Sequence, residues 1–301
     1  MEKKKIAFVG SGIIGSGLAV NALTHGYPVT LQTRSRVEKM KSRVAHILEI
    51  LVENEVCSQA EAAVAAARAT YTTSLEDAAT GAFFVQESGP ENPDVKKALY
   101  RQIESVCDAD TIIASSTTAL MPSLLQEGAT HPERILVGHP FHPSYLLPLV
   151  EICGGAQTDP SVTAGAKAFY ESIGKLALLC GKEISGYIVN RVNWAALEEA
   201  KKTVLDGVCS VEDIDKAIMF GPGLRMAVLG QMLTISLGIE GGFRGGAAKY
   251  GKEPSPDDEL LARGVEEEIA KRPEALGNTE ETVRDFRDKA IIRILRLQNM
   301  L

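Results

Sequence analysis

The sequence is poor in cysteine and in aromatic residues, and it has no long hydrophobic run. Its five cysteines are scattered without paired spacing, which argues against a disulfide framework or a zinc site and favours reduced thiols that are buried as structural residues. No apolar stretch reaches the length that spans a membrane. The first residues lead directly into an expected strand, which leaves no room for a signal peptide. We therefore expect a soluble, cytoplasmic protein.

Positive charge is also in short supply. The chain has 32 lysines and arginines against 39 aspartates and glutamates, which gives a formal net charge of −7, and no basic tract offsets that average. This balance argues against nucleic acid as a partner. Hydrophobic residues make up 45% of the 301 positions, which is enough for the core of one large domain or two ordinary ones.

The glycine motif near the N-terminus is the first sign of a ligand. It joins an apolar strand at 6–9 to a helix that ends at Gly26, and it consists of Gly10, Ser11, Gly12, Ile13, Ile14 and Gly15. In this pattern Gly10 permits a tight turn, Gly12 lets the backbone approach a pyrophosphate, and Gly15 lets helix and strand pack closely. The helix N-terminus adds partial positive charge. An ordinary glycine-rich turn is the alternative, but the flanking strand and helix favour a dinucleotide site.

The end of the second expected strand, at 29–32, indicates which dinucleotide binds. Thr33 stands where an acidic residue would bind the ribose 2′-hydroxyl. Arg34 and Arg36 follow, and guanidinium groups can bind a 2′-phosphate through charge-assisted, often bidentate hydrogen bonds. Two solvated surface arginines are the alternative. We predict that NADP(H) is favoured over NAD(H).

Short β-rich runs alternate with helical patterns up to about residue 183. The expected strands are 6–9, 29–32, 70–73, 83–87, 111–114, 135–139, 149–152 and 176–179. Such alternation is typical of an α/β fold with a doubly wound, mainly parallel sheet. Residues 37–69 predict a helical hairpin inserted in this sheet, with a break near Cys57.

Beyond Glu183 the strand signals give way to long helical patterns. We therefore predict a dinucleotide-binding domain at 1–184 and an all-helical domain at 185–301. Within the second, a capped helix is expected to start at Ser210, and the region 241–251 is expected to be a loop. The last helix carries an apolar stripe that packs either within the chain or against a second copy, formed by Val283, Phe286, Ala290, Ile291, Ile294 and Leu297.

A histidine and a glutamate on neighbouring expected strands can carry chemistry. His139 ends a strand on the carboxyl side of the sheet, where open α/β folds bind ligands, and Glu151 can reach it from the next strand. A histidine held by a carboxylate is a general acid or base near neutral pH. A purely structural hydrogen bond is the alternative. His142, which lies between two prolines, is interpreted as structural.

Several motifs, taken together and in order, resemble the 3-hydroxyacyl-CoA dehydrogenase superfamily. They are the glycine motif at 10–15, Ala-Ser-Ser-Thr-Thr-Ala-Leu at 114–120, Gly-His-Pro-Phe-His-Pro at 138–143, Leu-Val-Glu at 149–151 and Gly-Tyr-Ile-Val-Asn-Arg at 186–191. The resemblance extends to about residue 235. It implies a Rossmann domain, a helical C-terminal domain that binds substrate and forms homodimers, and hydride transfer at a 3-hydroxy or 3-keto group.

The resemblance also assigns roles to residues. It makes His139 the general base, Glu151 its partner, and Asn190 a residue that helps to hold the substrate oxygen. Thr118 falls where the family has a substrate-binding serine; the hydroxyl is retained, and the extra methyl narrows the site. Elsewhere the resemblance implies a pair that lines the cofactor site, formed by Glu91 and Lys96. A plain surface ion pair explains that pair equally well.

Within the superfamily, residues 140–151 and 221–226 look closer to the carnitine dehydrogenase and gulonate dehydrogenase (lambda-crystallin) branch than to the acyl-CoA enzymes. The helical insert has no lysine or arginine from 44 to 67, so little there attracts the phosphates of CoA. Arg225 can clamp a small carboxylate, with a surface or interdomain salt bridge as the alternative. Trp194, the single tryptophan, has no evident cage for a cation, so a quaternary ammonium substrate is not favoured.

We therefore expect an NADP(H)-dependent oxidoreductase that acts on a small 3-hydroxy or 3-keto acid or a β-dicarbonyl compound, with His139 and Glu151 as its acid–base pair. Gln231 and the stretch 241–246 depart from relatives where the substrate pocket is expected to close, so the substrate stays open. Two alternatives remain. One is a 3-hydroxyacyl-CoA dehydrogenase that uses NAD, and the other is a non-catalytic, nucleotide-binding crystallin-like protein.

Overall fold

The chain divides into two compact units, Met1–Ala195 and Ala196–Leu301. The computed structural model describes residues 3–10, 12–249 and 251–301, so Met1, Glu2, Ser11 and Tyr250 lie outside the described residues. Within those ranges no single helix is long and apolar enough to cross a membrane, while one bent pair, Val211–Leu229 with Gln231–Leu237, meets the length and composition criteria together.

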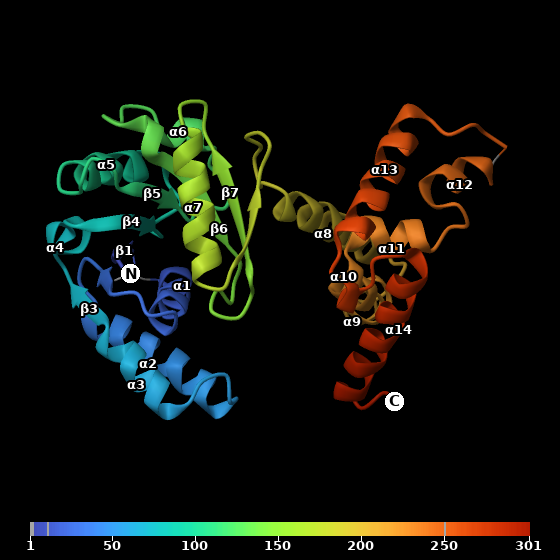
Figure 1. Ribbon diagram of the computed structural model, residues 1–301, viewed down its shortest axis with the longest axis horizontal. Helices are drawn as coiled ribbons and strands as arrows, with labels where there is room; N and C mark the ends of the chain where they lie inside the picture. The colour runs from blue at the N-terminus through green and yellow to red at the C-terminus, as the bar shows by residue number, and fades with distance from the viewer. Residues whose placement is uncertain (1–2, 11, 250) are drawn as a thin grey trace. The chain divides into compact units, whose positions relative to one another are not determined.

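An eight-stranded sheet forms the centre of the N-terminal unit, in the order β3-β2-β1-β4-β5-β6-β7-β8 (Figure 1). Its strands are β1 (Lys5–Val9), β2 (Val29–Gln32), β3 (Ala69–Thr72), β4 (Ala82–Glu87), β5 (Ile112–Ser115), β6 (Ile135–Pro140), β7 (Leu149–Gly154) and β8 (Leu176–Leu179). All neighbouring pairs are parallel except β6 and β7, which are antiparallel. The predicted doubly wound, mainly parallel sheet is confirmed, because every predicted strand is present with ends shifted by two residues at most.

Helices cover both faces of this sheet (Figure 1). One face is covered by α1 (Ile13–Thr24) and α7 (Pro160–Ser172), and α2 (Val37–Glu53) and α3 (Gln59–Ala67) pack on α1. The opposite face is covered by α4 (Leu75–Ala79), α5 (Pro93–Glu104) and α6 (Pro122–Leu125), and the short 3₁₀ helix η1 (Pro132–Arg134) leads into β6. The break between α2 and α3 is set by Ser58, which caps α3 in a reciprocal pair with Glu61.

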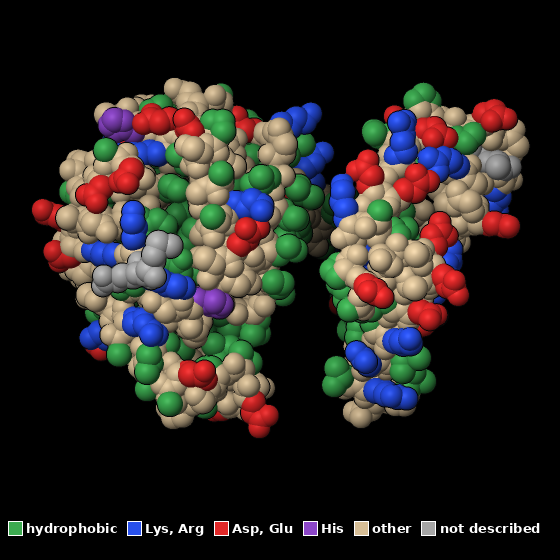
Figure 2. All heavy atoms as spheres, in the orientation of Figure 1, with side chains coloured by type: hydrophobic (Ala, Val, Ile, Leu, Met, Phe, Trp, Pro, Cys, Tyr) green, Lys and Arg blue, Asp and Glu red, His purple; other side chains and the backbone are tan. Residues whose placement is uncertain are grey.

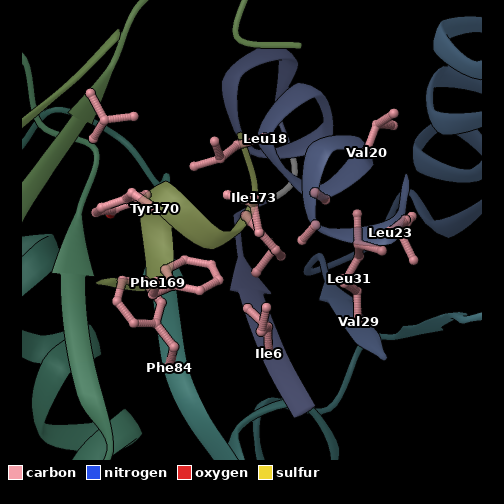
Figure 3. Close-up of a cluster of buried hydrophobic side chains, with 14 of the residues drawn as sticks. Ile6, Leu18, Val20, Leu23, Val29, Leu31, Phe84, Phe169, Tyr170 and Ile173 are labelled. Atoms are coloured by element: carbon pink, nitrogen blue, oxygen red, sulfur yellow. The ribbon is translucent and has the colours of Figure 1, made fainter. Parts of the chain in front are cut away.

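Apolar side chains fill the space between the sheet and α1 and α7 (Figure 3). The rings of Phe84 on β4 and Phe169 on α7 lie 4.1 Å apart between their centroids, and Leu18 on α1 is fully buried in the same cluster. Burying a side chain of this size stabilises a fold by about 1.5–3 kcal/mol. This core fixes the carboxyl edge of the sheet, where the glycine motif and His139 lie.

The C-terminal unit is helical. Its elements are α8 (Val189–Leu205), which begins in the N-terminal unit, α9 (Val211–Ile218), a π-helical turn η2 (Met219–Gly223), α10 (Leu224–Leu229), α11 (Gln231–Leu237), α12 (Gly242–Ala248), α13 (Pro256–Lys271), a 3₁₀ turn η3 (Glu274–Leu276) and α14 (Glu280–Leu297). As predicted, Ser210 caps a helix start, in a reciprocal pair with Asp213. A small core joins α10, α11, α13 and α14 and includes Leu233 and Val283.

The predicted loop at 241–251 is wrong in part, because Gly242–Ala248 form α12. Glycine disfavours a helix, so local sequence did not indicate one. Tertiary contacts outweigh that preference, since Arg244 donates to Glu259 of α13 at 3.0 Å and also pairs with Glu266. The ion pairs of Arg244 thus favour a helix in a segment whose glycines disfavour one.

The predicted burial of the cysteines is found at one position only. Cys153 is buried, but Cys57, Cys107, Cys180 and Cys209 are only half-buried, so the expectation that every cysteine is buried is wrong.

On α14 the apolar stripe is buried at Val283, while Leu297 is 85% exposed. Hydrophobic and charged side chains are interspersed on the surface of this unit (Figure 2).

Candidate active site

A cavity of about 820 Å³ opens at the carboxyl end of β1 and β2. The glycine motif, the residues that follow β2, the start of α2 and one side of α5 line it. Parallel α/β sheets bind ligands at this edge. Its volume lies in the range of small-molecule and cofactor sites.

At one position of the glycine motif the backbone is open to a ligand, and at two others the backbone packs too closely for any side chain. A Cβ on Gly10, whose φ is +82°, would lie 2.8 Å from the backbone of Ser88 and Gly89, and a Cβ on Gly15 would lie 3.0 Å from the Gly10 carbonyl oxygen. Gly12 has no atom within 4 Å of that position. The motif therefore fits a pyrophosphate next to Gly12, at the start of α1.

The two isoleucines of the motif are placed differently: one has an exposed side chain, and the other is held through its backbone. Ile13 is 58% exposed, whereas the Ile14 carbonyl oxygen accepts a hydrogen bond from Ser144 Oγ at 2.9 Å. This bond ties the first turn of α1 to the loop that follows β6. The phosphate-binding end of α1 is thus held by the same connection that carries the chain from β6 to β7.

Positive charge surrounds the other end of the cavity. Thr33, Arg34 and Arg36 line it, as do Lys39 and Arg43 of α2, and no carboxylate is among its described lining residues. Lys39 and Arg43 were not predicted from the sequence. Their spacing of four residues places them on one face of a helix. That spacing, shortly after Arg36, could have indicated that both face the cofactor site.

His139 and Glu151 are direct partners across the antiparallel pair β6 and β7. His139 Nδ1 lies 3.0 Å from Glu151 Oε2. The other carboxylate oxygen, Oε1, accepts from the backbone N–H groups of Ile188 at 2.8 Å and Val189 at 2.9 Å. Glu151 is fully buried and His139 is 5% exposed. A buried carboxylate with every oxygen bonded holds the histidine ring in one orientation.

A buried polar network supports the strand that carries His139. Gln86 on β4 donates to the Gly138 carbonyl oxygen at 3.1 Å and to Ser116 Oγ at 2.7 Å, and it accepts from Tyr170 Oη at 2.6 Å. Gly138 has no room for a side chain, because a Cβ would lie 1.8 Å from Tyr170 Oη. This network was not anticipated from the sequence, since its members are far apart in the chain.

Asn190 lies next to the backbone of Thr118. Asn190 Nδ2 lies 3.5 Å from the Thr118 carbonyl oxygen. Thr118 is exposed and Asn190 is 9% exposed. Glu91 holds the turn on which Thr118 lies, because its Oε1 accepts from Thr118 N at 2.9 Å, Ala119 N at 3.2 Å and the Thr117 hydroxyl.

Lys96 is buried, so a plain surface ion pair with Glu91 is wrong; neither residue is among the described ones that line the cavity, and their role at the cofactor site stays a prediction. Lys96 is 1% exposed and lies 2.9 Å from both oxygens of Glu87, but 3.9 Å from Glu91. Two hydroxyl groups also donate to Glu87 Oε2, that of Tyr100 at 2.8 Å and that of Ser115 at 3.0 Å. Burial and the adjacent Glu87 charge raise the pKa of Tyr100 well above its usual value. Sequence spacing could not identify Glu87 as the partner of Lys96, because Glu87 lies on β4 and Lys96 on α5.

Three further candidate residues are Arg225, Trp194 and His142. Arg225 is exposed on α10 of the C-terminal unit, and its contact with a substrate stays a prediction. Trp194 on α8 packs against Gly186, where a Cβ would lie 2.4 Å from the indole ring. His142 is exposed.

An open α/β sheet that carries along its carboxyl edge a glycine-lined cavity and a histidine held by a buried carboxylate is the arrangement of a nicotinamide-dependent dehydrogenase. The comparisons with known proteins agree. Residues 5–184 match the family model "3-hydroxyacyl-CoA dehydrogenase, NAD binding domain", and residues 186–279 match "3-hydroxyacyl-CoA dehydrogenase, C-terminal domain". The chain belongs to the 3-hydroxyacyl-CoA dehydrogenase family and is an oxidoreductase with a nicotinamide cofactor.

Individual relatives indicate which members of the family this chain resembles. L-carnitine dehydrogenase of Pseudomonas putida is 36% identical over 98% of this chain and 94% of its own length. The enzyme of the same name from Streptomyces griseus is 40% identical over 80% of this chain and 72% of its own length. Among solved structures, (S)-3-hydroxybutyryl-CoA dehydrogenase from Ralstonia eutropha is 29% identical with a TM-score of 0.69, over 73% of this chain and 78% of that one.

Proposed function

We propose that this protein is an NADP(H)-dependent oxidoreductase that transfers a hydride between nicotinamide and a small 3-hydroxy or 3-keto acid, or a β-dicarbonyl compound. The contact that carries the proposal is the 3.0 Å hydrogen bond between His139 and Glu151 at the carboxyl edge of the sheet. It supports a general acid–base role for His139, with Glu151 as its positioning residue.

The bound nicotinamide supplies or takes up the hydride. The protein's own residues move the proton. Glu151 accepts from His139 Nδ1–H, which leaves Nε2 to take a proton from a substrate hydroxyl in oxidation or to give one to a carbonyl oxygen in reduction. Glu151 also stabilises the imidazolium that forms. The Thr118 hydroxyl and the Asn190 amide are donors suited to the substrate oxygen as negative charge develops on it.

NADP(H) is proposed over NAD(H) because of the charge that lines the cavity. Arg34, Arg36, Lys39 and Arg43 all line it, and a phosphate on the ribose 2′-oxygen would gain charge-assisted hydrogen bonds there. Each such bond contributes about 1.5–3 kcal/mol. Thr33, with no carboxylate, would neither bind a ribose diol strongly nor repel a 2′-phosphate.

A small acid is proposed over a CoA thioester. The two helices that follow β2, α2 and α3, have no lysine or arginine from 44 to 67, so the phosphates of CoA find little charge there. The curated relatives give L-carnitine a place among the substrates to test, since carnitine is itself a small 3-hydroxy acid. In the described chain Trp194 has no aromatic ring partner, so 3-hydroxy acids without a cationic group are preferred over a quaternary ammonium.

A homodimer through the C-terminal unit and a cytoplasmic location complete the proposal. Large apolar side chains of this unit are exposed in the single chain, among them Leu205 at 83%, Val208 at 73% and Val211 at 64%. Exposed apolar surface of this kind marks an interface in soluble proteins.

The cofactor test compares kcat/KM with NADPH and with NADH in the unmutated protein, Arg34→Ala and Arg36→Ala. We expect NADPH to be preferred by about tenfold to a hundredfold, with most of that preference lost in the variants. Lys41→Ala is the matched control, because Lys41 lies nearby in the chain, on α2, but pairs with Glu38 and is not among the described residues that line the cavity. A preference for NADH in the unmutated protein would contradict the cofactor assignment.

The chemical test uses His139→Ala with a panel of 3-hydroxy acids, L-carnitine and acetoacetyl-CoA. We expect a loss of turnover of about 10²–10⁴-fold, while NADPH binding, followed by its fluorescence, stays unchanged. Normal turnover in this variant would refute the role of His139. Saturable activity on acetoacetyl-CoA would instead support an acyl-CoA enzyme, and binding without turnover of any substrate would support a non-catalytic protein.

A further inference from the structure

Two cysteines, distant in sequence, occupy neighbouring positions at the edge of the sheet. Cys153 lies on β7 and Cys180 directly follows β8. These strands are parallel, Ile152 pairs with Leu179, and Cys180 N donates to the Ile152 carbonyl oxygen at 2.8 Å. The next pair in this register is Cys153 with Cys180. Both side chains belong to the same apolar cluster, so they point to the same face of the sheet.

This placement suits a disulfide bond. Neighbouring strands in a sheet lie about 5 Å apart, and a disulfide requires a Cα separation of about 4.4–6.8 Å with Cβ atoms directed toward each other. The Sγ atom of Cys153 also faces the segment that contains Cys180, because it lies 3.9 Å from the Lys182 carbonyl oxygen. The Cα separation expected for neighbouring strands thus lies within the range of a disulfide bond.

The two thiols are chemically unequal. A hydrogen bond from the Cys153 thiol lowers the pKa of Cys180, even though burial and the charge of Glu151 act against this shift. The same hydrogen bond, together with burial, raises the pKa of Cys153. Cys153 is fully buried, whereas Cys180 is only partly buried. A partly exposed thiol with a lowered pKa next to a second thiol is the arrangement of a redox-sensitive cysteine and its resolving partner.

Other cysteines lack these properties. Burial raises the pKa of both Cys57 and Cys107, which makes their thiolates scarcer at neutral pH. Cys107 is the more informative comparison, because it is half-buried against the same apolar cluster as Cys153 and Cys180. Reactivity at the pair therefore follows from the pairing rather than from location on this face.

We propose that Cys153 and Cys180 form a reversible oxidation site that a hydroperoxide converts to an intramolecular disulfide. The Cys180 thiolate attacks one peroxide oxygen, the O–O bond breaks, and the leaving oxygen departs as water after it takes up a proton. Cys180 is then a sulfenic acid. The sulfur of Cys153 attacks the Cys180 sulfur, the S–O bond breaks, and the hydroxyl group leaves as water with the proton of Cys153. The two thiols lose two electrons, and one hydrogen peroxide is reduced to two waters.

The site lies next to the proposed acid–base pair without being part of it. Cys153 follows Glu151 by two residues on β7, and the segment after Cys180 leads to the Ile188 and Val189 N–H groups that bind Glu151. A disulfide would tether this segment to β7. Because it closes a loop that includes α7, it would also restrict the unfolded chain and raise the midpoint of thermal unfolding.

The test treats the full chain with hydrogen peroxide in small excess, blocks remaining thiols with an alkylating reagent and maps the peptides. We expect an intact-mass loss of about 2 Da that dithiothreitol reverses, with one peptide pair that joins Cys153 to Cys180. Two results would overturn the proposal: both thiols still alkylated when other cysteines are oxidised, or Cys180 oxidised to sulfinic acid without a link to Cys153.

Variants test the order of events. In Cys153→Ser, a sulfenic acid should persist on Cys180 and react with dimedone, whereas Cys180→Ser should leave Cys153 unmodified. Cys107→Ser is the matched control and should form the disulfide at the unmutated rate. Equal dimedone labelling of both single variants would contradict the assigned roles. Because peptide mapping uses the unmutated chain, the central claim is testable even if a variant does not fold.

Discussion

Replacing Glu151 with glutamine probes the proposed acid–base pair most sharply, because it changes few atoms. The carboxylate accepts from His139 through one oxygen and from Ile188 and Val189 through the other. An amide has only one accepting oxygen, so Glu151→Gln cannot satisfy both sets of donors. Leaving a buried N–H unpaired costs about 1–3 kcal/mol. The amide oxygen should therefore turn toward the two backbone N–H groups, and the amide NH₂ toward His139.

This orientation reverses the histidine tautomer. With an NH₂ group facing it, Nδ1 must accept, so the ring proton moves to Nε2, the nitrogen that has to take the proton of a substrate hydroxyl. The corresponding change in serine proteases lowers kcat by about 10⁴-fold with the geometry intact. We expect Glu151→Gln to lower kcat for alcohol oxidation by about 10³–10⁴-fold, or about 4–5.5 kcal/mol in the barrier. The free energy of unfolding should fall far less, by about 1–2 kcal/mol, since most hydrogen bonds remain.

The assay is steady-state kcat in the oxidation direction, with NADPH binding and urea unfolding measured on the same preparations. Glu183→Gln is a matched control, because Glu183 also accepts a backbone N–H, that of Ser123 at 2.7 Å, but has no contact with His139. It should lose stability and keep kcat. A folded Glu151→Gln protein with kcat within about tenfold of the unmutated value would refute the tautomer argument.

Three further predictions follow from buried or crowded positions. Gly138→Ala should lower the free energy of unfolding by about 3 kcal/mol or more, measured by urea titration, because its Cβ would lie 1.8 Å from Tyr170 Oη. Glu91→Ala should lower kcat/KM by about tenfold by releasing the turn that carries Thr118, and Glu91→Gln should largely restore it, because one amide oxygen can still accept from that turn. Burial lowers the pKa of Lys175 to about 8, from 10.5, so above pH 8 the unfolded chain binds more protons and stability rises with pH. Between pH 7 and pH 9.5 the unmutated protein should gain about 2 kcal/mol relative to Lys175→Met, and an equal response of both proteins would contradict the burial argument.

Local sequence predicted the sheet well, because strand formation in a parallel α/β fold depends on short apolar runs bounded by turn residues. The run at 149–152 and the run at 176–179 appear as β7 and β8. The position of His139 at the end of β6 followed from the same pattern. Its placement opposite Glu151 required in addition that β6 and β7 be antiparallel neighbours in one particular register.

Long-range partners were not predictable in this way. Lys96 appeared to pair with Glu91 because the two are close in sequence, yet its ammonium group lies 2.9 Å from Glu87, on β4. Gln86 and Tyr170 are separated by 84 positions. Their hydrogen bond depends on where α7 packs, and no local pattern encodes that. Buried polar partners are fixed by tertiary packing, so sequence spacing identifies them only when the partners lie on one element.

The antiparallel pairing of β6 with β7 also links catalysis to folding. Side chains on a strand alternate between faces, so a slip of one residue between these strands would move Glu151 to the face opposite His139. The glycine motif follows β1, which pairs with neither strand, so the motif would persist even if its hydrogen bond from Ser144 were lost. During refolding, a chain with this fault would bind the nucleotide but remain inactive. Turnover, compared with nucleotide fluorescence over time, would therefore report when these two strands reach their native alignment.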